Sequence, residues 1–184
     1  MKNIKKIALA TLTALATLAP AANAKFEDKH GNVFYEPSDF GGVHATLVDR
    51  LYEVGIPVVD GRGTNLCANE NTLGWYTPRD NFMVICNGDY TDRAETLTHE
   101  AVHVIQDCRA GLNNSEMENP TLDYFRFFVD KLGKRTTNWI ANTYDKEDWA
   151  TEVEAFYYET RPSAVTDDVE RACGLTGYQA GENF

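Results

Sequence analysis

The chain has 184 residues, and its 17 basic and 28 acidic side chains give a net charge of −11. This acidic excess repels phosphate, so it excludes a nucleic acid or an anionic membrane as a partner held by bulk charge. Hydrophobic residues make up 43% of the chain and no long polar tract interrupts them, which excludes a disordered chain, a collagen-like repeat and a coiled coil. The length favours one domain.

The N-terminus has the pattern of a secretory signal peptide. Three lysines precede an apolar run at residues 7–19, which ends in Ala-Asn-Ala at 22–24. A retained membrane anchor is the alternative, but the run is short for a bilayer and charged residues follow it at once. We therefore expect residues 1–24 to be removed, leaving a mature domain at 25–184 with a charge of −14 and no membrane-spanning segment, in a periplasm or outside the cell.

The chain has four cysteines, all in the predicted mature part. An even number in an oxidising compartment indicates two disulfides. We favour Cys67 with Cys86, which brackets a predicted hairpin, and Cys108 with Cys173, which ties the middle of the chain to its end. No two cysteines are spaced as a Cys-x-x-Cys pair, so a cysteine zinc site is disfavoured.

The first half of the mature chain predicts a helix and a small sheet. Residues 25–42 are polar and are expected to be an extended, partly mobile segment. Apolar spacing then predicts a helix at 46–54 that Gly55 closes, followed by a strand at 56–59. Two further strands, 73–77 and 82–86, form a predicted hairpin about a Pro-Arg-Asp-Asn turn.

Helical patterns dominate the second half. A helix is expected at 92–110, with Asp92 and Glu95 as a capping box and Gly111 as its stop. Two more helices are expected at 120–132 and at 146–161, the second ended by Pro162, and a last helical turn or two before Gly174. The sequence therefore predicts a single α+β domain in which a small antiparallel or mixed sheet packs on a long helix, with further helices toward the C-terminus.

The helix at 92–110 contains His99-Glu100-Ala101-Val102-His103. Four residues turn a helix by about 400°, so the two histidines share a face and can bind one Zn²⁺ together. Glu100 points about 100° round, where a carboxylate can take a proton from an attacking water and deliver it to a leaving amine. The apolar stripe of this helix lies on the opposite face, so the histidines are not needed for that core. An ordinary surface pair of histidines is the alternative.

This segment resembles the zincin metallopeptidases, whose long helix bears His-Glu-x-x-His beneath a small sheet. The metzincin branch is excluded, because its glycine and third histidine are replaced here by Gln106 and Arg109. The resemblance then implies a glutamate ligand on a later helix, as in gluzincins, and Glu152-Val153-Glu154-Ala155 resembles their Glu-x-x-Ala element. Glu152 lies about 80° from the apolar stripe of its helix and Glu154 about 120°, so we favour Glu152. Two ordinary solvent-facing glutamates are the alternative.

Many relatives carry Asp or Asn four residues after the ligand glutamate, where this chain has Phe156. Either Glu159 or Asp107 could orient a histidine instead, and the choice is open. The resemblance also implies an oxyanion-stabilising side chain, for which Tyr144, Tyr157 and Tyr158 are candidates, and a substrate-pairing edge strand. The candidate strand is 82–86, although both its faces are apolar and a fully buried strand is the alternative.

The expected function is that of an exported zinc metallopeptidase acting on peptides or proteins. His99, His103 and Glu152 would bind one Zn²⁺ per chain, and Glu100 would act as general base and acid. The alternative is a secreted, disulfide-stapled binding module with a closed metal site or none. His30 and His44 are the other histidines that could close such a site.

Overall fold

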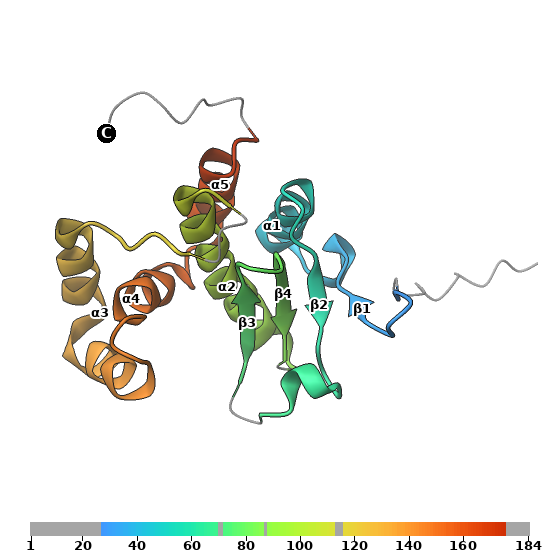
Figure 1. The fold of residues 1–184 in the computed structure, drawn as a ribbon, viewed down its shortest axis with the longest axis horizontal. Coiled ribbons are helices and arrows are strands. Elements are labelled where there is room, and N and C mark those ends of the chain that lie inside the picture. Colours follow the sequence, from blue (N-terminus) through green and yellow to red (C-terminus); the bar gives the residue numbers. More distant parts are fainter. Residues whose placement is uncertain (1–26, 70–71, 87, 113–115, 176–184) are drawn as a thin grey trace, which may run out of the picture.

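The computed structural model describes residues 27–69, 72–86, 88–112 and 116–175. The predicted signal peptide at 1–24 lies outside these residues. Within them, a four-stranded mixed sheet lies on one side of a long central helix, and most of the remaining helices lie on the other (Figure 1). The predicted α+β class, with a small mixed sheet, is confirmed.

The sheet has the strand order β1-β2-β4-β3. Its strands are β1 (Val33–Phe34), β2 (Val58–Asp60), β3 (Gly74–Thr77) and β4 (Phe82–Ile85). The predicted hairpin is confirmed, since β3 and β4 are antiparallel with Trp75 opposite Val84. However, β4 also pairs in parallel with β2 and is an interior strand. Of the two alternatives for 82–86, the buried strand is confirmed and the edge strand is wrong, because the apolar pattern on both faces reflects burial, and the edge is β3.

The N-terminal segment is more ordered than expected. Tyr35 and Phe40 are buried in the core on either side of a short 3₁₀ helix, Pro37–Asp39. Helix α1 (Gly42–Glu53) buries Leu47, Val48 and Leu51 as its periodicity requires, but it begins four residues before the predicted start at 46. Its first turn buries nothing, so hydrophobic spacing carried no sign of it.

The central helix is α2 (Tyr90–Ala110). Its N-cap is Asp89, whose carboxylate accepts the N–H groups of Thr91 at 2.9 Å and Asp92 at 3.2 Å, so the predicted cap at Asp92 is displaced by three residues. Gly111 ends the helix at a φ of 103°, as expected. Every residue from 96 to 107 is buried, because β3, β4, α1, α4 and α5 all pack on this helix. Such a helix has no solvent face, so its polar residues must find partners inside the protein.

Helix α3 (Leu122–Thr143) is longer than the predicted 120–132. Gly133 has a φ of 74° and breaks the helix into two halves at that point, a conformation that glycine adopts without strain. The second half turns back along α4 (Trp149–Tyr158), and Phe128, Ile140 and Val153 form a small core between them.

Helix α5 (Pro162–Ala172) replaces the expected last turn or two. Pro162 occupies its first position, where the missing N–H costs nothing, so this proline begins α5 rather than ending α4. Helix α4 already ends at Tyr158. The α5 residues Val165 and Val169 join the main core with α1 and α2.

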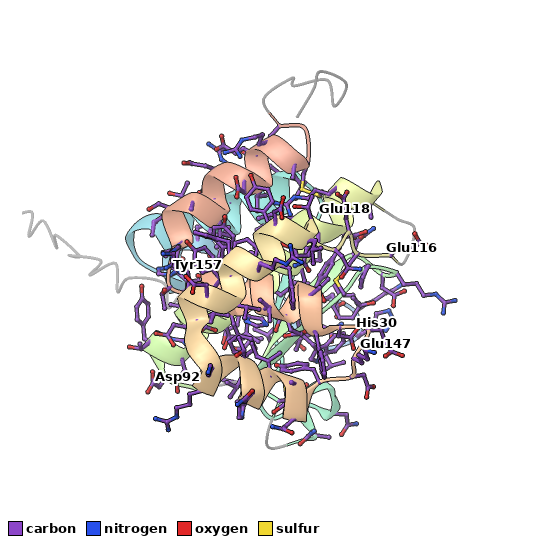
Figure 2. The ribbon with its side chains drawn as sticks, turned by 90° about the vertical axis from the view of Figure 1, so that its left-hand side faces the viewer. His30, Asp92, Glu116, Glu118, Glu147 and Tyr157 are labelled. Carbon is purple, nitrogen blue, oxygen red and sulfur yellow. A yellow bond between two sulfur atoms is a disulfide. The ribbon has the colours of Figure 1, made fainter. Side chains whose placement is uncertain are left out.

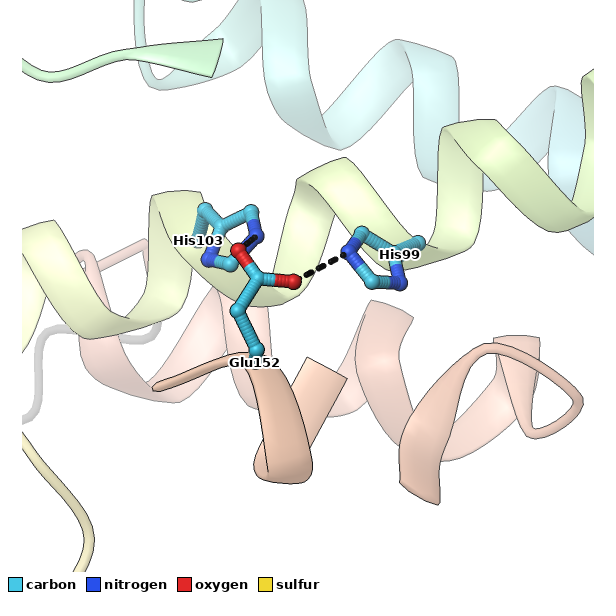
Figure 3. Close-up of side chains that lie close together, drawn as sticks. All are labelled: His99, His103 and Glu152. Carbon is cyan, nitrogen blue, oxygen red and sulfur yellow. Dashed lines mark ion pairs between the residues drawn. The ribbon is translucent and has the colours of Figure 1, made fainter. Parts of the chain in front are cut away.

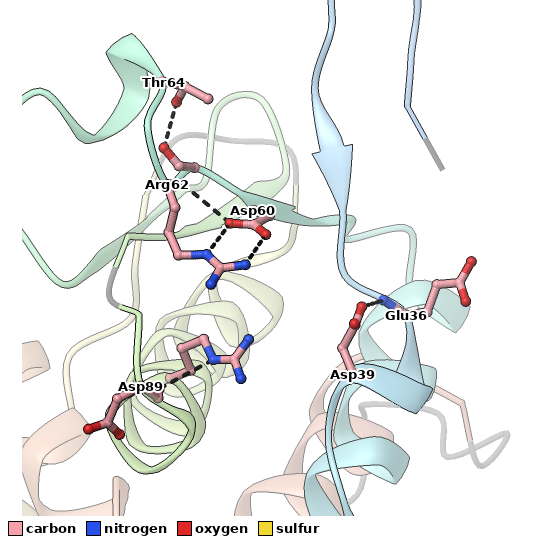
Figure 4. Close-up of polar contacts among 8 residues, drawn as sticks. Glu36, Asp39, Asp60, Arg62, Thr64 and Asp89 are labelled. Atoms are coloured by element: carbon pink, nitrogen blue, oxygen red, sulfur yellow. Dashed lines mark hydrogen bonds and ion pairs between the residues drawn. The ribbon is translucent and has the colours of Figure 1, made fainter. Parts of the chain in front are cut away.

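Both expected disulfides are present. Cys67 and Cys86 have Cα atoms 5.5 Å apart and tie the loop after β2 to the end of β4. In that loop Asp60 holds Arg62 in a two-pronged ion pair (Figure 4), and a Cβ atom on Gly61 would lie 2.4 Å from Cys67 Sγ. Cys108 and Cys173 have Cα atoms 5.1 Å apart and join the last turns of α2 and α5.

The surface carries much of the acidic charge. Asp92, Glu116, Glu118 and Glu147 are all exposed, as is His30 (Figure 2). In the part of the chain that the structure describes, no helix has the length and apolar character needed to cross a membrane.

Replacing both Cys108 and Cys173 with serine is expected to lower the free energy of unfolding by about 4 kcal/mol, because their bond closes a long loop in the unfolded chain. Urea unfolding under non-reducing conditions measures the change. The Cys67→Ser/Cys86→Ser pair closes a shorter loop and should cost about 3 kcal/mol. An unchanged midpoint in the first variant would contradict the expectation.

Candidate metal centre

Three side chains meet between α2 and α4. His99 and His103 lie one turn apart on α2, and Glu152 reaches them from α4 (Figure 3). Glu152 Oε2 lies 3.3 Å from His99 Nε2, and Glu152 Oε1 lies 3.4 Å from His103 Nε2. The three residues are only 8%, 6% and 9% exposed. The structure therefore brings together the three predicted ligands in a buried group that could hold a metal ion.

The spacing of these atoms fits an ion better than it fits hydrogen bonds. The two distances from Glu152 are longer than charge-assisted hydrogen bonds, which measure about 2.7–2.9 Å, and one ligand atom from each of the three residues lies within 4.8 Å of the other two. Glu152 Oε2 is buried and has no hydrogen-bond partner among the described residues. A carboxylate oxygen in that position needs a cation, and two imidazole nitrogens beside it are suitable co-ligands.

Gln106 fixes the orientation of His103. The Gln106 side-chain amide donates from Nε2 to the Thr151 carbonyl oxygen and to Glu154 Oε2, both at 3.0 Å. Its Oε1 must then be the atom 2.8 Å from His103 Nδ1, which makes Nδ1 the protonated nitrogen and directs the Nε2 lone pair at the metal position. The sequence analysis noted Gln106 only as a departure from the metzincin pattern. Its position about one helical turn after His103 was the signal that could have identified its role in orienting that histidine.

Glu154 supports this arrangement instead of joining the ligands. Its Oε1 accepts a hydrogen bond from Arg109 at 2.8 Å while Oε2 accepts from Gln106. Glu154 is buried, as Glu152 is, so the alternative of two solvent-facing glutamates is wrong. The helix-face argument that separated Glu152 from Glu154 agrees with the observed contacts.

His99 has a carboxylate and an aromatic ring beside it. Glu159 Oε2 lies 3.5 Å from His99 Nδ1, so Glu159 is the one of the two orienting candidates that faces this imidazole. Asp107, the other candidate, instead accepts a hydrogen bond of 2.5 Å from the hydroxyl of Tyr76 on β3. Phe156 packs edge-to-face on His99, with the ring centroids 4.6 Å apart.

Glu100 lies under the edge strand β3. A Cβ atom on Gly74 would lie 2.4 Å from Thr96 Cγ2 and 3.4 Å from Glu100 Cγ, so only glycine lets the strand approach α2 this closely. The backbone N–H of Tyr76 faces the Glu100 carboxylate. Burial raises the pKa of Glu100, which prepares this carboxylate to take up a proton.

The three candidate tyrosines occupy different environments. Tyr144, at the end of α3, lies beside Glu152, and its pKa is raised by burial and by the Glu152 and Glu100 carboxylates. Tyr157 packs on Phe127 and Phe128, and Tyr158 also packs on Phe128. Tyr144 is therefore the tyrosine that the structure places at the metal centre.

The ligand residues have strongly shifted pKa values. Burial opposes ionisation of Glu152, but the two facing imidazoles outweigh it and lower its pKa to about 2. Burial likewise disfavours the imidazolium of His99, but the Glu152 and Glu159 carboxylates raise its pKa to about 10. In the absence of a metal, protonation of the imidazoles is therefore favoured, and a cation must displace these protons in order to bind.

Comparisons with family models, with characterised proteins and with solved structures found no match to this chain. The geometry of the residues is thus the basis for its functional assignment.

Gln106→Met is expected to weaken zinc affinity about 10- to 100-fold, because His103 loses the partner that fixes its tautomer. Competition with a chelator of known affinity measures the change. Thr98→Val is the matched control: it also removes a buried polar group from α2, but that hydroxyl bonds only the Ala94 carbonyl. Equal zinc affinity in the two variants would contradict the role given to Gln106.

Metal binding is expected to release about one proton or more near pH 7, because the raised pKa of His99 keeps its imidazole protonated until a cation displaces the proton, and the pKa of His103 is also raised. The protonated state is the metal-free state, so zinc affinity should weaken as the pH falls and strengthen as it rises. Calorimetric titration in two buffers with different ionisation enthalpies counts the protons. Full binding with no proton release would show that the imidazoles were neutral beforehand.

Proposed function

We propose that this chain is an exported zinc peptidase of the zincin type. The observation that carries the proposal is the buried group of His99, His103 and Glu152 with the carboxylate of Glu100 next to it in the sequence and also buried. Catalytic zinc sites use three protein ligands and leave the fourth position for water or substrate, whereas structural sites use four. Among the described residues the group has three members, and neither His30 nor His44 belongs to it.

Zinc is the metal that this set of ligands suits best. Two imidazoles and one carboxylate are a recurrent ligand set of hydrolytic zinc enzymes. A site for Mg²⁺ or Ca²⁺ would instead be built from oxygen ligands in larger number. The second contacts of the histidines, to Gln106 and Glu159, further support neutral imidazole ligands with fixed orientations.

A zinc ion in this group would supply a Lewis acid that polarises a carbonyl and lowers the pKa of water. The protein residues supply the remaining steps. Glu100 takes the proton of the attacking water and then gives it to the leaving amine, a role that its raised pKa favours. The hydroxyl of Tyr144, next to Glu152, donates a hydrogen bond to the oxygen that becomes negative in the transition state.

The edge of β3 supports a peptide as the substrate. The Cys86 N–H donates to the Leu73 carbonyl, and hydrogen bonding alternates along an antiparallel pair, so the backbone groups of Gly74 and Tyr76 point away from β4. The N–H of Tyr76 already faces the Glu100 carboxylate, so an extended peptide would pair as an added strand through the other outward backbone groups of this edge. Its scissile bond would then lie next to Glu100, because the N–H of Tyr76 faces that carboxylate.

Export is proposed from the N-terminal pattern together with the two disulfides. Both disulfides require an oxidising compartment to form and persist.

Glu100→Gln is expected to bind about one zinc per chain, as the wild type does, while its peptide hydrolysis falls by about 10²- to 10⁴-fold, because an amide cannot take the proton. Elemental mass spectrometry on the purified oxidised protein gives the metal content, and a quenched-fluorescence peptide library gives the rate. His103→Ala is the control that should lose the metal itself.

Two results would contradict the proposal. Turnover at the wild-type rate in Glu100→Gln would remove this residue from the mechanism. No metal in the wild type, even after zinc is supplied and the excess removed, would instead favour the secreted binding module.

A further inference from the structure

Phe156 lies beside a candidate metal ligand but cannot form a hydrogen bond with it. It lies one helical turn after Glu152 on α4, so its side chain reaches the same side of the helix, and its ring packs edge-to-face on His99 at 4.6 Å. An Asp or Asn there could orient the imidazole, but a phenyl ring cannot. Glu159 faces His99 Nδ1 instead, at 3.5 Å.

Phe156 belongs to a cluster of three aromatic rings. Trp139 packs on it with an interplanar angle of 87° and a centroid distance of 5.2 Å. Tyr144 lies 6.1 Å from each of the other two rings. Trp139 and Tyr144 come from the second half of α3 and its C-cap, which reach the metal centre because Gly133 breaks the helix. We call these three residues, Trp139, Tyr144 and Phe156, the aromatic wall.

The aromatic wall runs from solvent to the metal ligands. At its outer end Trp139 is 50% exposed, and at its inner end Phe156 contacts His99 and Tyr144 lies beside Glu152. The exposed part of this indole is apolar surface next to the metal ligands, and a ligand that covered it would gain the free energy of burying that surface. Tyr124, on the first half of α3, is 62% exposed and stacks on Phe128, which belongs to the core between α3 and α4 against which Tyr144 and Phe156 also pack.

We propose that the aromatic wall is a specificity subsite that binds an aromatic or large aliphatic side chain of the peptide substrate. This inference rests on the proposed peptidase function and names its substrate class. The strand β3 lies over Glu100 and holds the peptide backbone, while the aromatic wall contacts His99 and Glu152 and meets the side chain next to the scissile bond. Apolar contact with the rings supplies the discrimination, and edge-to-face packing favours aromatic side chains further.

The test uses two matched pairs of probes on the zinc-loaded wild-type protein. The first pair is a quenched-fluorescence peptide with Phe next to the scissile bond and the same peptide with Ala there. The second pair is phenylalanine hydroxamate and alanine hydroxamate, which bind zinc without being cleaved. We expect the Phe member of each pair to be preferred about 10- to 100-fold, in kcat/KM or in affinity respectively.

Trp139→Ala should reduce both preferences to less than about threefold, because the outer ring of the aromatic wall is lost. Trp139 is half exposed, so the variant is expected to fold, and its zinc content and circular dichroism verify this. Tyr124→Ala is the matched control: it removes another exposed aromatic residue of α3, whose ring stacks on Phe128 and not on a residue of the aromatic wall, and it should keep the wild-type preferences. Phe156→Leu keeps an apolar side chain but removes the ring, and should selectively weaken the aromatic member of each pair.

The outcomes separate this inference from the proposed function. Hydroxamate discrimination that Trp139→Ala abolishes, without cleavage of either peptide, would support the subsite and overturn the peptidase. Cleavage of both peptides at equal rates, or a Phe preference that survives in Trp139→Ala and Phe156→Leu, would overturn the subsite and leave the peptidase standing.

Discussion

The packing of α4 across α2 is the interaction on which the rest of the structure depends. Helix α2 is buried from residue 96 to residue 107 and carries His99, Glu100, His103 and Gln106 within that stretch. Buried polar groups are stable only when each finds a partner, and α4 supplies partners in the Glu152 and Glu154 carboxylates and the Thr151 carbonyl. The same contacts that satisfy the interior of the protein thus place three ligand atoms around one point.

Much of this centre could be predicted from the sequence, because its signals are local. The spacing of His99 and His103 places them on one helix face, and a simple helix-face comparison separated Glu152 from Glu154. The hairpin and both disulfides were also predicted correctly, since turn residues and an even number of cysteines constrain the possibilities. Features that depend on the packing of distant segments could not be predicted in this way. Gln106 orients His103 only because α4 brings Thr151 and Glu154 to the other end of its amide.

The helix boundaries that were predicted wrongly also depend on the packing of distant segments. Pro162 can end one helix or begin another, and only the packing of Val165 and Val169 on α1 and α2 decides for α5. The second half of α3 follows a glycine, which a local pattern interprets as a stop, although the helical conformation resumes after Gly133. For the strand at 82–86 the sequence left an edge strand and a buried strand open, and the apolar residues on both faces are typical of the interior strand that it is.

The bond between Cys108 and Cys173 has a topological consequence. It turns the intervening chain into a covalent ring that contains α3 and α4, and therefore Trp139, Phe156 and Glu152. A single cut of the backbone anywhere in that ring leaves the two pieces joined. Even in such a nicked molecule, Glu152 stays tethered to the helix that carries His99 and His103.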